Sequence, residues 1–171
     1  VLNTNTRYLN DLLDEYAERL LATLPSAFDV CYFVNSASEA NELALRLSRA
    51  YTGARDIVVL DAAYHGNTTS LIDISPYKHA GPGGQGAPDW VHSVPLPDVY
   101  RGQHRGADAG SLYASSVKAA ISELESHGRR LSAFIAETCP SVGGQLIFPP
   151  DYLSTVYEHV RRAGGICIAD E

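Results

Sequence analysis

The 171 residues are 45% hydrophobic and 19% charged, which is typical of a globular domain and excludes a disordered, fibrous or membrane-spanning chain. The formal net charge of −7 argues against nucleic acid as a partner, because phosphate backbones are bound by basic surfaces. No apolar run approaches the ~18 residues needed to cross a bilayer, so we expect no membrane contact. The cysteines are scattered and lack CxxC spacing, which predicts no metal site and favours reduced thiols in the cytoplasm.

The first predicted elements are two helices separated by a strand. Apolar residues repeat at i, i+3, i+4 and i+7 over residues 7–24, which predicts an amphipathic helix with one buried stripe that ends before Pro25. Residues 30–34 are β-prone and apolar throughout, which is typical of a strand buried on both faces. A second helix follows, and its apolar face runs from Ala40 to Tyr51.

Strands and helices then alternate to the end of the chain. The predicted strands cover residues 57–60, 90–96, 131–136 and 165–169, and the predicted helices cover residues 110–127 and 150–162. This alternation predicts an α/β fold of three layers, αβα, with a mainly parallel sheet between the helices. Ligands of such sheets bind at the carboxyl ends of the strands, so the residues that follow each strand are the candidates for a site.

Residues 75–110 are rich in Pro and Gly. We expect them to form a long, ordered excursion within the domain, because long loops of compact domains tend to be functional. Residues 81–86 match the pattern GxGxxG letter by letter. No predicted strand precedes them and no predicted helix follows, so the pattern does not favour a dinucleotide site.

The second helix opens with Ser36, Ala37, Ser38 and Glu39. In one interpretation Ser36 and Glu39 form a capping box. In the other, the free amides of the first helical turn bind an anion, and the two hydroxyls beside them suit a phosphate monoester. The two interpretations are compatible, since the cap fixes the same amides.

Polar residues also follow three later strands. Tyr64, His65 and Gly66 would place an aromatic face beside a glycine that lets the backbone approach a ligand. Glu137 leads into a loop with a double glycine, which suggests that the backbone there passes close to another group. Asp170 is a carboxylate on an apolar strand, and its burial is costly unless it meets a cation or donors. Each of these signals alone is also consistent with an ordinary structural role.

Four blocks, taken in order, resemble the class-III aminotransferases, which are fold-type I enzymes that use pyridoxal phosphate (PLP). The matching blocks are residues 33–41, 61–66, 136–144 and 168–171. The resemblance covers nearly the whole chain. It implies that residues 1–171 are part of the PLP-binding large domain of a homodimeric enzyme, without the rest of that domain and without the C-terminal small domain.

Within that family the chain is most similar to the phospholyases that act on ethanolamine phosphate and phosphohydroxylysine. This likeness is carried by residues 3–9, 74–78 and 141–145. Val142 stands where ordinary ω-aminotransferases usually carry Glu, which makes generic transamination less favoured. Ala37 stands where the family usually has Gly, and its methyl group slightly crowds the phosphate loop but leaves the amides in place.

The resemblance implies a role for residues near the start of the chain. Ser36, Ala37 and Ser38 would hold the cofactor phosphate, mainly through backbone amides. Tyr64 would stack on the pyridine ring, and His65 would belong to the cofactor-binding set.

The resemblance assigns the catalytic roles to Glu137 and Asp170, which would also bind the cofactor. Asp170 would pair with the pyridine nitrogen, and Glu137 would join the polar network around it. A carboxylate beside the nitrogen keeps it protonated, because an opposite charge at close range raises its proton affinity. The protonated ring then absorbs electrons released at the substrate carbon.

PLP enzymes need a lysine for covalent attachment of the cofactor, and this chain contains only Lys78 and Lys118. Neither matches the family position, which follows the strand of Asp170. The sequence also lacks Met and opens on Val1. We therefore expect a piece of a longer protein that is inactive alone, although the longer protein is an enzyme.

Other functions remain open. The expected substrate is a primary amine or amino acid, or a phosphorylated amine from which phosphate is eliminated. The residues do not separate aminotransferase from phospholyase, because both use the same electron sink. The alternatives are a nucleotide-binding α/β oxidoreductase or transferase, and a noncatalytic α/β module.

Overall fold

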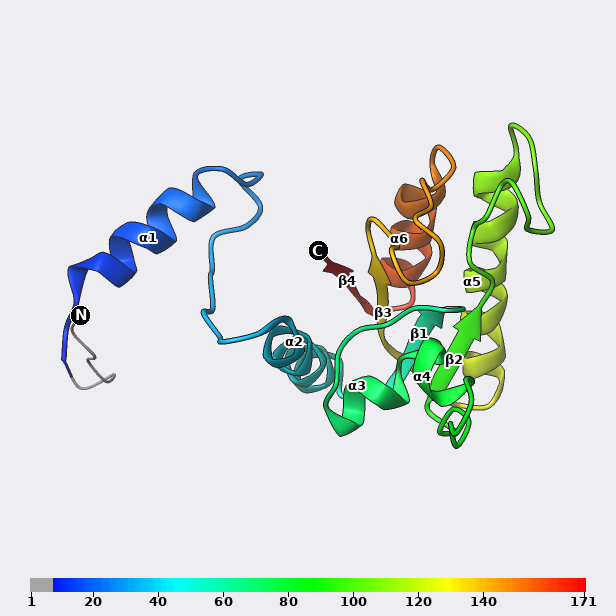
Figure 1. Cartoon of the computed structure of the whole chain (residues 1–171), viewed down its shortest axis with the longest axis horizontal. Coiled ribbons are helices and arrows are strands. Elements are labelled where there is room, and N and C mark those ends of the chain that lie inside the picture. Colours follow the sequence, from blue (N-terminus) through cyan, green and yellow to red (C-terminus); the bar gives the residue numbers. More distant parts are fainter. Residues whose placement is uncertain (1–7) are drawn as a thin grey trace. The chain divides into compact units, whose positions relative to one another are not determined.

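The computed structural model describes residues 8–171, which belong to two compact units (Figure 1). The first unit ends at Val34, and the second runs from Asn35 to Glu171. The boundary between the units does not fall inside residues 75–110, and all of these residues belong to the second unit.

Residues 8–34 of the first unit contain one helix, α1 (Asp11–Leu21). It lies within the predicted range 7–24, of which residue 7 is outside the described part. Its cap is Asn10, whose side chain accepts a hydrogen bond from the N–H of Leu12 at 3.1 Å. The prediction of a buried stripe was wrong for this unit: no residue of α1 is buried, and Leu12 is 71% exposed. The reason is size, because a segment this short cannot enclose a core of its own.

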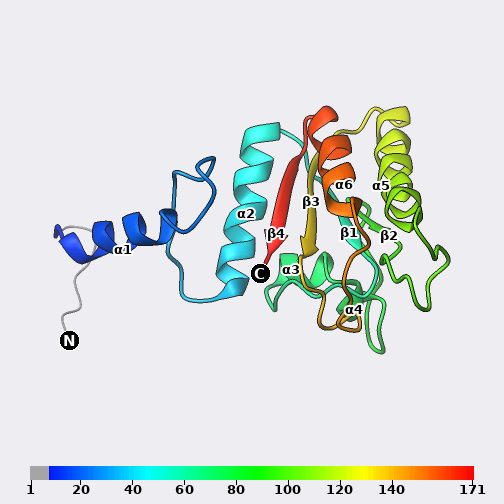
Figure 2. The same ribbon diagram turned by 90° about the horizontal axis from the view of Figure 1, so that it is seen from above.

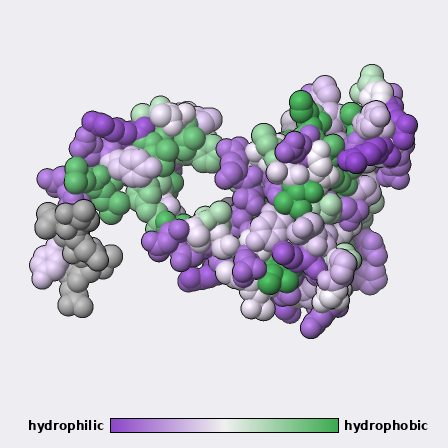
Figure 3. All heavy atoms as spheres, in the orientation of Figure 1, coloured by the Kyte–Doolittle hydropathy of each residue, from purple (hydrophilic) through white to green (hydrophobic). Residues whose placement is uncertain are grey.

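The predicted strand at residues 30–34 is also wrong, since this segment forms no regular secondary structure and most of its side chains are exposed. An apolar run satisfies the burial requirement of a strand, but a strand also needs a neighbour for its backbone N–H and C=O groups. No described strand pairs with these residues. Phe33 instead stacks on Tyr16 at 5.0 Å, and hydrophobic groups lie at the surface of the unit (Figure 3).

The second unit is an α/β structure with four strands. Its elements in order are α2 (Ala37–Thr52), β1 (Asp56–Leu60), α3 (Thr69–Asp73), α4 (Pro76–His79), β2 (Val91–Val94), α5 (Ala109–Ser126), β3 (Leu131–Glu137), α6 (Tyr152–Arg162) and β4 (Ile166–Asp170). The strands lie in the order β2-β1-β3-β4, and all neighbours are parallel. The predicted strands and helices after residue 35 are therefore confirmed, whereas the short helices α3 and α4 were not predicted.

Alternation along the strands builds the three layers. In β1, Val58 and Leu60 join a core with α5 and α6, whereas Ile57 and Val59 join a second core with α2 and α3. Figures 1 and 2 show these helix pairs on opposite sides of the sheet. Because both faces are covered, all five residues of β1 are buried, which explains why residues 57–60 are apolar throughout.

The parallel register brings polar residues together at the carboxyl ends of the strands. Glu137 ends β3 and is paired in register with Asp170, which ends β4. The loop after β1 begins at the same end of the sheet, because Leu60 is paired with Val94 at the carboxyl end of β2. None of the helices described between residues 8 and 171 is long and apolar enough to cross a membrane.

Candidate functional site

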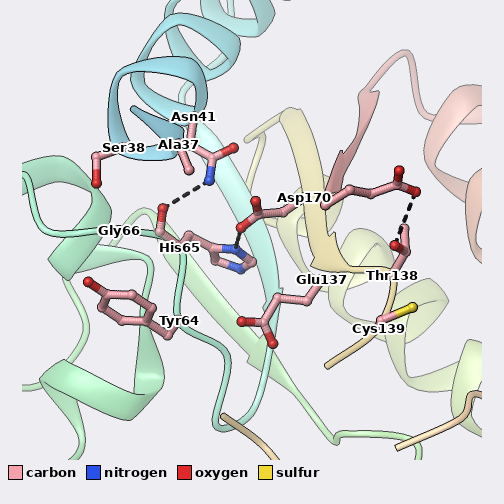
Figure 4. Close-up of a pocket in the computed structure, with 11 residues that line it drawn as sticks. Ala37, Ser38, Asn41, Tyr64, His65, Gly66, Glu137, Thr138, Cys139 and Asp170 are labelled. Carbon is pink, nitrogen blue, oxygen red and sulfur yellow. Dashed lines mark hydrogen bonds and ion pairs between the residues drawn. The ribbon is translucent and has the colours of Figure 1, made fainter. Parts of the chain in front are cut away.

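A cavity of about 570 Å³ opens at the carboxyl ends of the strands. Its lining residues come from the start of α2, the loop after β1 and the ends of β3 and β4 (Figure 4): Ala37, Ser38, Asn41, Tyr64, His65, Gly66, Glu137, Thr138, Cys139, Asp170 and Glu171. The structure thus brings together six of the seven predicted site residues. Ser36 is the exception, since it does not line the cavity.

Ser36 caps α2. Its Oγ accepts a hydrogen bond from the N–H of Glu39 at 3.1 Å, and Glu39 reaches back to accept the N–H of Asn35 at 2.6 Å. The capping interpretation is therefore confirmed, with Glu39 bound one residue before the cap. The amides of Ala37 and Ser38 have no acceptor among the described residues, so they are free to donate to an anion in the cavity.

Two hydrogen bonds fix the loop after β1 against α2. The N–H of Asn67 donates to Ser38 Oγ at 3.1 Å, and Asn41 Nδ2 donates to the carbonyl of His65 at 2.9 Å. Gly66 lies between them with φ +136°, and a Cβ there would stand 2.5 Å from Leu71 Cδ1 and 2.7 Å from Ser38 Oγ. The backbone at Gly66 therefore closely approaches α2, whereas its predicted approach to a ligand stays a prediction.

His65 and Asp170 form a hydrogen-bonded pair inside the cavity. Nδ1 of His65 lies 2.9 Å from Oδ2 of Asp170, with the imidazole fully buried and the carboxylate 16% exposed. The backbone N–H of His65 donates to Ser75 Oγ at 2.9 Å, which anchors the loop on its other side. Asp170 thus meets the donor that a carboxylate on an apolar strand requires. The other imidazole nitrogen, Nε2, is buried and has no partner among the described residues.

Glu137 is the second partly buried carboxylate of the cavity. Burial raises its pKa, against the opposing effects of the nearby His65 imidazole and a backbone hydrogen bond from Ser141. The negative charge of Asp170 adds to the upward shift of the pKa. The cavity therefore holds one carboxylate paired with a histidine and another whose pKa lies above that of an exposed glutamate.

Tyr64 supplies the aromatic wall. Its ring lies edge-to-face with that of Tyr77 at 6.2 Å, and Nζ of Lys78 lies 5.6 Å from the Tyr64 ring centroid. Figure 4 shows the Tyr64 ring and Glu137 on one side of His65, and Ser38 and Asn41 on the other.

Sequence reasoning gave no role to several cavity residues: Asn41, Thr138, Cys139 and Glu171. Asn41 lies three residues after Ser38 on the same face of α2, a spacing that could have indicated it. Thr138 directly follows β3, and its Oγ1 donates to Glu171 at 3.1 Å. The double glycine after Glu137 packs against the loop after β2, where Arg101 lies close to Gly144.

Chemically, the cavity can hold a ligand with two different ends. Free amides at the start of α2 favour an anion, while the paired carboxylate of Asp170 favours a cationic or protonated nitrogen. An aromatic face between them suits a flat ring.

Comparison with known proteins identifies the family. The family model described as "Aminotransferase class-III" matches residues 3–171. An "Alanine--glyoxylate aminotransferase 2-like" protein of Drosophila melanogaster is 46% identical over 99% of the chain, and "Ethanolamine-phosphate phospho-lyase homolog 1" of Caenorhabditis elegans is 44% identical over 98%. A solved phospholyase from Arthrobacter, in complex with phosphoethanolamine, aligns over 98% of the chain with a TM-score of 0.86 and 37% identity.

The chain spans 35% and 38% of the lengths of the two relatives, and 39% of the Arthrobacter chain. The family match covers nearly all of the 171 residues, and the fold agrees with that of the solved relative. The chain belongs to the class-III aminotransferase family.

Proposed function

We propose that the chain forms the PLP-binding part of an enzyme that acts on a primary amine or amino acid. The observation that carries this proposal is the placement of the free α2 amides and the Asp170 carboxylate on one cavity. They match the two ends of PLP, an anionic phosphate and a basic ring nitrogen. Residues 1–171 would then be part of the large domain of the longer protein.

The residues of the cavity fit this cofactor. The amides of Ala37 and Ser38 would hold the phosphate, with Ser36 acting through the cap rather than by contact. Tyr64 would lie against the ring, and Asp170 would face the ring nitrogen. Gly66 supports the fit, because any side chain there would intrude on Ser38.

When bound, PLP would supply an electron sink for the bond that breaks at the substrate carbon. Asp170 would hold a proton at the ring nitrogen through its negative charge. His65 orients that carboxylate through Nδ1, and the imidazole itself is fully buried. Glu137, whose pKa is raised by burial, would keep a proton near the cavity at a higher pH than an exposed glutamate does.

The lysines lie outside the cavity lining. Lys78 rests on aromatic rings, and Lys118 lines a groove with residues of α5 and α6. We therefore propose that the 171 residues hold PLP noncovalently and do not turn over substrate alone.

A second candidate function is elimination of phosphate from a phosphorylated amine. Two relatives favour it, the phospho-lyase homologue of Caenorhabditis elegans and the Arthrobacter phospholyase in complex with phosphoethanolamine. The Drosophila melanogaster relative instead carries the name of an aminotransferase.

The test is to express the longer protein with PLP and to run two assays with phosphoethanolamine. One assay measures the release of phosphate, and the other measures the transfer of the amino group to a keto acid. Phosphate release without amino transfer selects the lyase, and the reverse result selects the aminotransferase. Neither reaction, with alanine as a second amino donor also inactive, would contradict the proposal of an amine-processing enzyme.

We further propose that the protein acts as a homodimer. The exposed hydrophobic side chains of the first unit, among them Leu12, Tyr16 and Phe33, support this because such groups are usually covered. Sedimentation equilibrium of the longer protein is expected to give twice the monomer mass, and a monomer at micromolar concentration would contradict it.

A cytoplasmic location is proposed from the cysteines. Cys31, Cys139 and Cys167 are all free, as expected in a reducing compartment. Cell fractionation with antibodies to the protein tests this, and recovery in an organelle fraction would overturn it.

A further inference from the structure

The imidazole of His79, at the end of α4, is buried without a hydrogen-bond partner. The residue is 7% exposed, and neither Nδ1 nor Nε2 has a donor or acceptor within reach among the described residues. A neutral imidazole carries one N–H and one lone pair, so both are left unsatisfied. Because an unpaired polar group costs free energy when it is buried, the packing around this ring is held at a cost.

A glycine-rich loop, residues 81–86, packs on the end of α4. The N–H of Gly86 donates to the carbonyl of His79 at 2.9 Å. Gly84 lies so close to the same carbonyl that a Cβ there would collide with it. Residues 82–86 also line a groove of about 350 Å³ together with His79. Displacement of the loop would widen this groove and admit water to the ring.

The loop is weakly anchored apart from that one backbone contact. Gly83 and Gly86 have positive φ, and a Cβ at either would meet nothing within 4 Å. No residue of the loop belongs to either hydrophobic core or packs against one. Release of the loop from α4 therefore breaks the hydrogen bond between Gly86 and His79 without opening a core.

The environment of His79 favours the neutral ring while the loop is closed. Burial lowers the pKa of the imidazole, and the negative charge of Asp73 on α3 only partly opposes this shift. Asp73 also acts on Arg49 of α2, where burial lowers the pKa of the guanidinium and the carboxylate opposes that shift as well. The one carboxylate that acts on His79 is therefore shared with a second cation.

The other elements that pack against α4 supply no further negative charge to the ring. Lys78 lines the same groove and carries a positive charge, which disfavours a second one beside it. Residues 80–87 contain no ionisable side chain. The loop after β1 meets α4 away from the imidazole, since Tyr64 lies edge-to-face with Tyr77 and the N–H of His65 donates to Ser75.

We propose that His79 is a pH-sensitive latch, whose protonation releases residues 81–86 from α4. The charged ring needs water or an acceptor, and the groove supplies water once the loop has moved. The pKa of an exposed imidazole is about 6.5. The closed loop therefore has its full stability above this pH and loses it as the pH falls below, because the open form binds the proton more tightly. The latch lies outside the cavity, so this inference does not depend on the proposed function.

Hydrogen exchange of the longer protein, read by mass spectrometry of peptic peptides, tests the latch. Peptides that cover residues 80–87 report on the loop, and peptides that cover β1 report on the sheet. Exchange is measured at pH 7.5 and pH 5.5 and expressed as protection relative to the intrinsic rate at each pH. The wild type is compared with His79→Phe, which keeps a ring but cannot titrate, and with His127→Phe, which replaces an exposed histidine after α5.

Protection of residues 80–87 in the wild type should fall about tenfold from pH 7.5 to pH 5.5, because an exposed imidazole is about nine-tenths protonated at the lower pH. Protection of β1 should not fall with it. His79→Phe should keep the loop equally protected at both pH values, and His127→Phe should behave as the wild type does.

A second variant, Gly84→Ala, tests the latch even if His79→Phe does not fold. Its Cβ would push the loop off the carbonyl of His79, so residues 80–87 should exchange rapidly at both pH values. Wild-type protection that is independent of pH, or that falls equally in His79→Phe, would overturn the inference. So would a parallel loss of protection in β1, because the sheet would then be unfolding with the loop.

Discussion

The imidazole of His65 and the carboxylate of Asp170 are joined at 2.9 Å although they are 105 positions apart in the sequence. The pair connects the loop after β1 to the end of β4, across the intervening strand β3. His65 is held from its backbone side by Ser75 and Asn41, so the carboxylate has a fixed orientation in the cavity. This arrangement makes His65 a positioning residue for the group that would face the ring nitrogen of PLP.

Replacement of His65 by Phe should therefore weaken PLP binding at least tenfold. The ring volume is kept, but Asp170 loses its donor, and an unsatisfied polar group in a partly buried site costs about 1–3 kcal/mol of folding free energy. Titration with PLP, followed by absorbance, measures the affinity, and urea unfolding measures the stability.

The matched control for this change is His92→Phe. His92 Nε2 lies 2.8 Å from Asp56 at the start of β1. This contact is at the amino-terminal end of the strand, whereas the cavity lies at the carboxyl ends. The His92→Phe change should lower stability without changing the affinity for PLP. Equal losses of PLP affinity in both variants would indicate a general structural effect and contradict a positioning role.

The Gly66→Ala change should destabilise the fold by about 1–3 kcal/mol, because it combines an unfavourable φ with the contact against Ser38 and Leu71. It should also weaken PLP binding by displacing Ser38. Gly83→Ala is the control, since Gly83 has φ +81° but a Cβ there would meet nothing within 4 Å. Chemical denaturation and PLP titration of both variants separate the backbone cost from the steric one, and identical effects at the two sites would refute the steric argument.

The Glu137→Gln change should stabilise the chain more at neutral than at acidic pH. The pKa of Glu137 is higher in the folded chain than in the unfolded one, mainly because of burial. The unfolded chain thus releases this proton first as the pH rises, and folding stability is lost as the pH passes through the raised pKa. Glutamine carries no ionisable proton, so the variant does not lose this part of its folding stability as the pH rises. Thermal midpoints of the wild-type chain and the variant from pH 4 to pH 8 test this. A difference between the two midpoints that shrinks towards neutral pH would contradict the prediction.

Treatment of the chain with PLP and borohydride should label neither lysine stoichiometrically. Nζ of Lys78 contacts two aromatic rings, and Lys118 lies on α5 in a groove away from the cavity. Mass spectrometry of proteolytic peptides detects the reduced adduct. One equivalent of label on Lys78 or Lys118 would show that the chain supplies its own attachment lysine.

Much of the second unit could be predicted from sequence because burial on both faces imposes a simple pattern. Residues 57–60 are apolar because both faces of the strand are buried, and the alternation of strands with helices implied parallel strands. The same rule failed at residues 30–34, where the pattern is present but no described strand supplies a hydrogen-bonded neighbour. Helices as short as α4 carry too few residues for a period to be recognised.

The site was predictable as a set of strand ends, but its internal contacts were not. The rule that ligands collect at carboxyl ends placed Tyr64, Glu137 and Asp170 together. Pairing of His65 with Asp170 depends on the strand order, which periodicity does not specify. The position of Lys78 against Tyr64 depends on the path of α4, an element that the pattern did not indicate.

The central claim is that one PLP molecule spans the cavity from α2 to β4. A crystal structure of the chain soaked with PLP tests it most directly. The account predicts the phosphate at the amides of Ala37 and Ser38, the ring against Tyr64 and the ring nitrogen within hydrogen-bonding distance of Asp170. A phosphate bound elsewhere, or a ring nitrogen directed away from Asp170, would contradict the account.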